Sequence, residues 1–194
     1  MKKYIEMILR KIGVSMLALL IVMTTYFSNS GGSLFLKTKK VQADTGETTL
    51  AMSQAMSRNK IPAIGRAASE GLWAMTAGGH RVFCLNSGKT MCSGDTLKYK
   101  TVNAATYEKK GIAKALQWYF MKSNKNTKAL ALTQAYIWAC GHGANKQNTV
   151  YQAGKNVQKG YSQNDAKKFC ETISDQDPEG TIYYYTVKKC VKKK

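Results

Sequence analysis

Five cysteines are the most reactive side chains of this chain: Cys84, Cys92, Cys140, Cys170 and Cys190. In an exported protein, cysteines are expected to form disulfides. Four of them can pair in three ways, and one thiol is then left over. That remaining thiol is a buried inert group, an intermolecular bridge or a nucleophile.

A second unusual side chain is Gln134, which lies in the apolar segment 129–143 (ALALTQAYIWACGHG). Apolar residues recur around it at the spacing of one helix face: Leu130, Ile137 and Trp138. The glutamine therefore occupies a stripe that is expected to face the core. A buried carboxamide without hydrogen-bond partners costs on the order of a few kcal/mol. Taken alone, the pattern favours a hydrogen-bonded core glutamine.

The segment 133–138 (TQAYIW) resembles the Thr-Gln-x-Ala-hydrophobic-Trp motif of bacterial thioester domains, which occur on Gram-positive surface adhesins. One position differs, because Tyr136 stands where that motif usually has alanine. The family also has an upstream cysteine on a strand, after an aromatic or apolar residue. Segment 82–86 (VFCLN) is similar to that feature, and the resemblance covers residues 73–143.

The resemblance implies an internal thioester between Cys84 and Gln134. The thiol attacks the side-chain carbonyl, ammonia leaves, and an S-acyl bond joins the two residues. An amide resists this attack in water, so the fold must hold the thiol and the carbonyl at near-attack distance. Such positioning can correspond to an effective molarity of about 10⁵–10⁸ M. Water must also be kept out, and the expected pocket residues are Phe83, Thr133, Ile137 and Trp138.

The thioester would store reactivity for one acyl transfer, so the protein is not expected to be an enzyme. A target amine, most simply a lysine on a host or surface protein, attacks the Gln134 carbonyl and expels Cys84. A free lysine has a pKa of about 10.4, so it must first lose a proton. His80 and His142 are the candidates to assist, although a surface or turn position is expected for both. No cofactor or metal is expected.

With Cys84 in a thioester, the other four cysteines can form two disulfides, for which we expect Cys92–Cys140 and Cys170–Cys190. Two other classes of function stay open. One is a cysteine hydrolase, in which His142 acts as base and Asp165 or Asn145 orients it. The other is a disulfide-stabilised basic module that binds anionic surfaces.

The periodicity predicts elements that would position these residues. Segment 71–86 predicts two strands around Gly78-Gly79, with Cys84 late in the second. Helices are predicted at 112–120, 127–140 and 163–174, with Asn126 or Thr127 and Ser162 as N-caps. Segment 181–188 (TIYYYTVK) predicts a strand. Residues 87–104 are expected to be loop or a short strand.

These elements predict an α+β domain with sandwich- or barrel-like strands and a small helical subdomain that carries the Gln134 motif. We expect a signal peptide over 1–43, a linker or N-terminal segment over 44–70, the thioester domain over 71–190 and a basic tail over 191–194. The thioester is expected where strands and helices meet.

The N-terminus predicts export, because a basic start precedes the apolar run 12–22 (IGVSMLALLIV) and small residues end at Ala43. Cleavage after Ala43 would give a secreted or cell-surface protein; an uncleaved anchor is the alternative. Residues 1–43 hold seven of the 30 basic and one of the 11 acidic residues, so the rest carries a formal charge of +13. Such a basic chain can bind an anionic polymer, but its lysines are spread out and no specific nucleic-acid site is indicated.

Overall fold

The computed structural model describes residues 45–57, 59–64, 71–85 and 91–191. The expected signal peptide with its cleavage site at Ala43, and the tail residues Lys192, Lys193 and Lys194, lie outside the described residues. Within those ranges, none of the helices has the length and apolar character needed to span a membrane.

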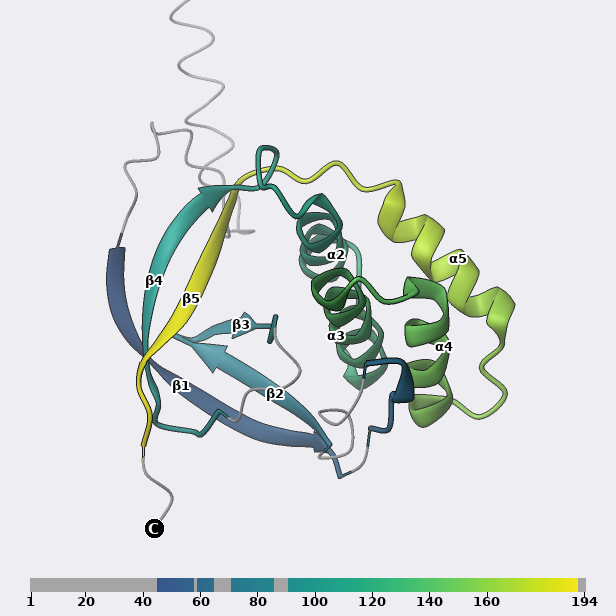
Figure 1. Cartoon of the computed structure of the whole chain (residues 1–194), viewed down its shortest axis with the longest axis horizontal. Helices are drawn as coiled ribbons and strands as arrows, with labels where there is room; N and C mark the ends of the chain where they lie inside the picture. The colour runs from purple at the N-terminus through teal and green to yellow at the C-terminus, as the bar shows by residue number, and fades with distance from the viewer. Residues whose placement is uncertain (1–44, 58, 65–70, 86–90, 192–194) are drawn as a thin grey trace, which may run out of the picture. The chain divides into compact units, whose positions relative to one another are not determined.

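Five antiparallel strands form one sheet in the order β3-β2-β1-β4-β5, and Figure 1 shows that this sheet is strongly curled. Their bounds are β1 Thr45–Met56, β2 Leu72–Ala77, β3 His80–Val82, β4 Thr96–Asn103 and β5 Thr181–Lys189. The helices lie to one side of the sheet, which makes the domain α+β, as predicted.

The central strand β1 lies within segment 44–70, which the sequence analysis expected to be a linker or N-terminal segment. It pairs with β2 along one edge, from Leu50 opposite Ala77, and with β4 along the other, from Thr45 opposite Lys100. Its sequence, TGETTLAMSQAM, has few large apolar residues and no clear alternation. Hydrogen bonding on both edges therefore defines this strand more than its own side chains do.

The hairpin predicted around Gly78-Gly79 is confirmed as β2 and β3. Both glycines have positive φ, at 58° and 81°, which is the conformation a tight turn of this kind needs. The second strand is shorter than predicted, because β3 ends at Val82. Cys84 therefore lies in the loop just after the strand, and the prediction that it is a strand residue is wrong.

Four α-helices follow: α2 Lys110–Met121, α3 Thr127–His142, α4 Lys146–Val157 and α5 Gln163–Ser174. A short 3-10 helix, η1, spans Pro62–Ile64. The predicted helices are confirmed as α2, α3 and α5, and the Asn126 and Ser162 side chains accept hydrogen bonds from backbone N–H groups as N-caps. The sequence pattern does not predict α4, whose residues are mostly polar.

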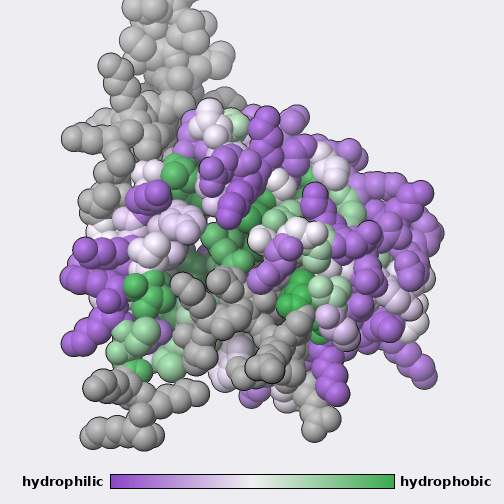
Figure 2. All heavy atoms as spheres, in the orientation of Figure 1, coloured by the Kyte–Doolittle hydropathy of each residue, from purple (hydrophilic) through white to green (hydrophobic). Residues whose placement is uncertain are grey.

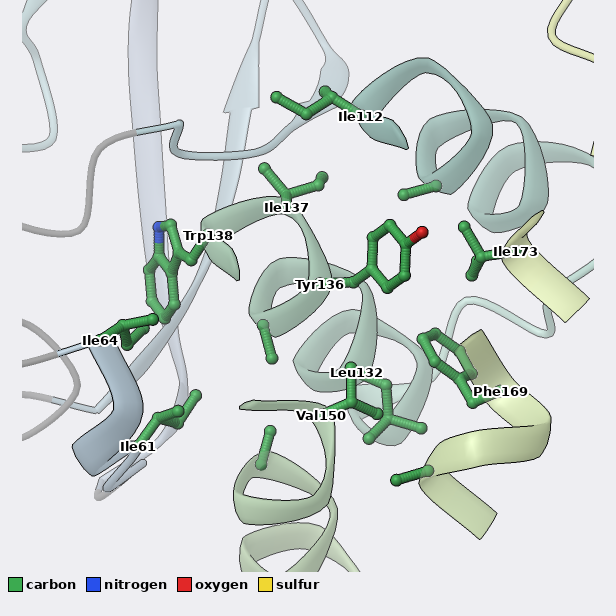
Figure 3. Close-up of a cluster of buried hydrophobic side chains, with 14 of the residues drawn as sticks. Ile61, Ile64, Ile112, Leu132, Tyr136, Ile137, Trp138, Val150, Phe169 and Ile173 are labelled. Atoms are coloured by element: carbon green, nitrogen blue, oxygen red, sulfur yellow. The ribbon is translucent and has the colours of Figure 1, made fainter. Parts of the chain in front are cut away.

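Two of the apolar clusters meet near the loop that follows β3. The helical core is centred on α3 and includes Tyr136, Ile137 and Trp138, which Figure 3 shows pointing to different neighbours around the helix. A smaller cluster, the sheet core, lies between strands and contains Leu50 and Leu97. Residues of β2 also pack against α2 and α3, which joins the sheet to the helices.

Candidate functional site

The carboxamide of Gln134 is bound at both ends by the main chain of Cys84. The Cys84 N–H donates to Gln134 Oε1 at 3.0 Å, and Gln134 Nε2 donates to the Cys84 carbonyl oxygen at 2.7 Å. Gln134 is only 2% exposed, so these bonds satisfy an amide that water does not reach. The structure thus brings together the two residues predicted to form the site, which are 50 positions apart in the chain.

The loop that carries Cys84 also contacts α3 at Leu85, the residue that follows the cysteine. An added Cβ at Gly141 would lie 2.9 Å from the Leu85 carbonyl oxygen, so only a glycine lets the loop approach this closely. Gly141 lies near the C-terminal end of α3, and Gln134 lies two turns earlier. Segment 83–85 therefore packs directly on the helix that carries the glutamine.

Two further contacts fix the loop where it leaves β3. The ring of Phe83 packs edge-on against Tyr119, with centroids 4.8 Å apart, and also meets Phe120. Burial raises the pKa of Tyr119, while the charge of Arg81 and its hydrogen bond with the Tyr119 side chain act in the opposite direction. Arg81 of β3 and Tyr119 of α2 thus hold the strand end beside the helices. No periodic pattern in the sequence predicts this pair.

Cys84 is half-buried and packs against both the helical core and the sheet core. The site thus lies where strands and helices meet. Among the four expected pocket residues, Phe83 is half-buried and packs against the helical core. Ile137 and Trp138 belong to that core, and Thr133 is fully buried next to the glutamine. Figure 3 shows Trp138 beside Ile64 of η1, and Ile137 on another side of α3, toward Ile112.

Two buried polar atoms of these pocket residues have no hydrogen-bond partner among the described residues: Thr133 Oγ1 and Trp138 Nε1. An unpaired buried donor costs about 1–3 kcal/mol, so such groups are uncommon in a folded protein. Thr133 lies directly beside Gln134 in the chain. The main chain of Cys84 thus supplies hydrogen-bond partners to the glutamine. The other pocket residues are apolar or carry a buried polar atom without a partner among the described residues.

The residues expected to orient a catalytic histidine already have other roles. The Asn145 side chain accepts from the Asn148 N–H and caps α4. Asp165 accepts from both the N–H and the hydroxyl of Ser162, which completes the capping box of α5 and keeps the pKa of this carboxyl below its usual value. His142 is an exposed residue at the end of α3, and His80 is exposed at the start of β3.

All five cysteines belong to the described residues, and no disulfide joins any two of them there. Cys140 and Cys170 both pack against the helical core, whereas Cys190 is exposed just beyond β5. In the same part of the chain, no group of three or more His, Cys, Asp or Glu side chains is placed to hold a metal ion.

Basic side chains are spread over several elements, as expected from the sequence. Figure 2 shows that, in the orientation of Figure 1, hydrophilic side chains cover most of the visible surface on the side of the helices. Only two ion pairs form among the described residues, Lys167 with Glu171 and Lys188 with Glu47. Most of the positive charge of this region is therefore not neutralised by neighbouring carboxylates.

Comparisons with protein-family models, with curated proteins and with solved structures found no match to this chain. The motif, the chemistry of its residues and the geometry around Cys84 and Gln134 are therefore the basis for proposing a function.

Proposed function

We propose that residues 45–191 form a thioester domain in which Cys84 Sγ is bonded to the side-chain carbonyl carbon of Gln134. The single observation that carries this proposal is the pair of hydrogen bonds between the Gln134 carboxamide and the Cys84 main chain. They hold the amide against the residue that bears the thiol, with both partners shielded by core residues. Such confinement is the condition under which a thiol can displace an amide nitrogen.

The same contacts support a mechanism for forming the bond. When Sγ attacks the carbonyl carbon, negative charge develops on Gln134 Oε1, and the Cys84 N–H that already donates to this oxygen stabilises it. The intermediate then collapses and expels Nε2, which leaves as ammonia with the proton from the thiol. One residue thus supplies both the nucleophile and the oxyanion donor.

The proposed use is the covalent capture of an amine. A neutral amine of a lysine on a host or surface protein attacks the Gln134 carbonyl, the Cys84 sulfur leaves as a thiolate, and an isopeptide-type bond remains. The event occurs once per molecule, so no turnover follows. From the predicted signal peptide, we propose that this action occurs outside the cell, in a secreted or surface adhesin.

The proposal includes the finer architecture expected from the sequence. In it, the curled sheet acts as a barrel-like support for the cysteine loop, and the helices act as a subdomain that presents Gln134. The packing of Cys84 against both the sheet core and the helical core supports this division of roles.

The decisive experiment is the intact mass of the folded protein, before and after treatment with methylamine. We expect the mass of the untreated protein to be lower, by one ammonia, than the mass calculated from its sequence with any disulfides. Methylamine should then raise the mass by that of one methylamine molecule, bound at Gln134. The Cys84→Ala variant should show neither change. A Cys92→Ala variant is the matched control, because it removes another half-buried cysteine and should keep both changes.

A mass that equals the sequence mass apart from disulfide hydrogens, together with full alkylation of Cys84 in the folded protein, would contradict the proposal. In that case Gln134 is a core residue whose only role is to satisfy the loop at Cys84.

The scarcity of ion pairs in the described part of the chain favours a second candidate, a basic module that binds anionic polymers through its lysines. This function and the thioester respond differently to salt. Binding through exposed lysines should weaken as ionic strength rises and survive Cys84→Ala. A covalent adduct should resist both salt and SDS, and should be lost in Cys84→Ala.

A further inference from the structure

The four cysteines other than Cys84 lie in two separate neighbourhoods. The first contains Cys140, at the end of α3, and Cys170, in α5. Both pack against the helical core, together with Tyr136 and Phe169. The second contains Cys92, just before β4, and Cys190, just after β5.

The Tyr136 side chain of α3 lies between the two cysteines of the first neighbourhood, Cys140 and Cys170. The Tyr136 side chain hydrogen-bonds with Ser174, and Figure 3 shows its hydroxyl directed toward Ile173 of α5. Cys140 lies one turn after Tyr136 in α3, and Cys170 lies one turn before Ser174 in α5. Cys140 and Cys170 thus lie around the same Tyr136 side chain: burial raises the pKa of this phenol, and both cysteines add to the rise.

Shared neighbours support this arrangement. An added Cβ at Gly111 would lie 2.9 Å from Cys140 Sγ and 3.9 Å from Lys146 Nζ, so sulfur and ammonium share the space that this glycine leaves open. Burial raises the pKa of the Cys170 thiol to about 11, the charge of Lys146 opposes that rise, and Cys140 and Glu171 add to it. Burial also raises the pKa of the Cys140 thiol, and the charge of Lys146 opposes that rise. Cys170 thus senses both Cys140 and Lys146.

The second neighbourhood is organised by Asp95, a carboxylate that is 1% exposed. One of its oxygens accepts from the Cys92 N–H at 2.9 Å, and the other accepts from the Val191 N–H at 2.8 Å. A Cβ at Gly94 would lie 3.2 Å from the Val191 side chain. One carboxylate therefore fastens the turn at Cys92 to the residue that directly follows Cys190.

The strand pairing extends to the same place. β4 and β5 pair along their whole length, and the last pair is Thr96 opposite Lys189. Cys190 follows Lys189, and the turn that contains Cys92 precedes Thr96. The two cysteines are thus at the same end of the same strand pair.

We propose that these four residues form two disulfides, Cys140–Cys170 and Cys92–Cys190. Each bond forms by thiol–disulfide exchange with a disulfide donor: the two thiols lose two protons and two electrons, and the donor is reduced to two thiols. The first disulfide would fasten α3 to α5, and the second would fasten the turn before β4 to the end of β5. The pairing expected from the sequence, Cys92–Cys140 and Cys170–Cys190, would instead join residues of different neighbourhoods.

This pairing would leave Cys84 as the one cysteine outside a disulfide, in agreement with its proposed role. The disulfides do not depend on the thioester, however, because they involve neither Cys84 nor Gln134.

The test is a peptide map of the full chain, folded in the presence of glutathione disulfide, blocked with an alkylating agent and digested with trypsin without reduction. The five cysteines fall in five tryptic peptides: 82–89, 90–98, 129–146, 169–188 and 190–192. We expect reductant-sensitive links between 129–146 and 169–188, and between 90–98 and 190–192. A thioester would instead join 82–89 to 129–146, would resist phosphine reductants and would carry the loss of ammonia, so either proposal can fail alone.

Two matched variants sharpen the result. Cys140→Ser should make Cys170 available for alkylation and leave the link between 90–98 and 190–192 intact. Cys92→Ser should release Cys190 and leave the helical link intact. A link between 90–98 and 129–146, or complete alkylation of all four cysteines after folding with the donor, would overturn the proposal. The map of the unmodified chain decides this even where a variant does not fold.

Discussion

The carboxamide of Gln134 is held by main-chain atoms of Cys84 and by none of its side-chain atoms in the two hydrogen bonds described. Removing the thiol therefore leaves both bonds in place, because any residue at position 84 except proline supplies the same N–H and carbonyl. Cys84→Ala should consequently remove the reaction while the loop keeps its position. This makes the variant a clean probe of chemistry rather than of folding.

Thr133 offers a test of how strongly the pocket tolerates an unsatisfied group. Its hydroxyl is buried without a partner among the described residues, so Thr133→Val should raise the free energy of unfolding by about 1 kcal/mol. Thr149 is the matched control: it is also fully buried, but its hydroxyl donates to the Asn145 carbonyl at 2.7 Å. Thr149→Val should lower the free energy of unfolding by about 1 kcal/mol. Urea denaturation of both variants measures the two changes.

A loss of stability in Thr133→Val would show that its hydroxyl does have a partner. If Thr133→Val leaves the free energy of unfolding unchanged but lowers the fraction of thioester measured by intact mass, the hydroxyl takes part in forming the thioester.

At the scale of residues, the sequence predicts that Cys84 and Gln134 lie together, but it does not predict the contacts that position the surrounding segments. Cys84 and Gln134 could be predicted because their types and their motif are visible in the chain. The contact of Arg81 with Tyr119 and the two bonds of Asp95 could not, because each joins residues that share no periodic pattern.

Among the elements, α3 has the most constrained packing, since it carries Gln134 and also contacts the cysteine loop at Gly141. Helix propensity alone favours Gly141→Ala by about 0.8–1 kcal/mol. The added Cβ would lie 2.9 Å from the Leu85 carbonyl oxygen, and relieving such overpacking costs about 1–3 kcal/mol. We expect a net loss of stability of about 1 kcal/mol, measured by urea denaturation, and a lower fraction of thioester by intact mass.

Gly111→Ala is the control for that variant. Its Cβ would meet Cys140 Sγ at the same 2.9 Å, which is an atom of α3 and not of the loop that carries Cys84. It should therefore affect stability without changing the thioester fraction. Equal loss of thioester in both variants would mean that Gly141 has no special part in positioning the loop.

The elements also show which structure a single sequence can reveal. Helices α2, α3 and α5 follow from apolar periodicity and recognisable caps. Helix α4 was missed because its buried face has a single branched apolar side chain, Val150, and otherwise small or polar residues: Thr149, Ala153 and Gly154. Strand β1 was missed because its neighbours, rather than its own pattern, hold it in the sheet.

For the molecule as a whole, the buried thiols and phenols predict that the free energy of unfolding of the reduced protein falls at high pH. In the folded protein the pKa of Cys170 is raised from 9.0 to about 11, and that of Tyr136 from 10.0 to about 12, mainly by burial. As the pH rises, the unfolded chain loses these protons before the folded chain does, which favours unfolding. The stabilisation present below about pH 9 should therefore decline up to about pH 11 for the thiol, and further for the phenol.

Denaturant titrations at increasing pH, with and without reductant, measure this effect. The oxidised protein should lose less stability than the reduced protein, because cysteines in disulfides do not titrate, whereas Tyr136 contributes in both. Identical curves would contradict the disulfide between Cys140 and Cys170.

The position of β1 has a consequence for how the chain acquires its structure. This strand is the first described segment to emerge, yet both of its partners come later, and β4 ends only at Asn103. During synthesis or translocation the middle of the sheet must wait with two open hydrogen-bonding edges, which is a state prone to association with other chains. Pairings between distant segments also slow folding. The polar, threonine-rich composition that hid this strand from pattern analysis is thus suited to keeping it soluble during that wait.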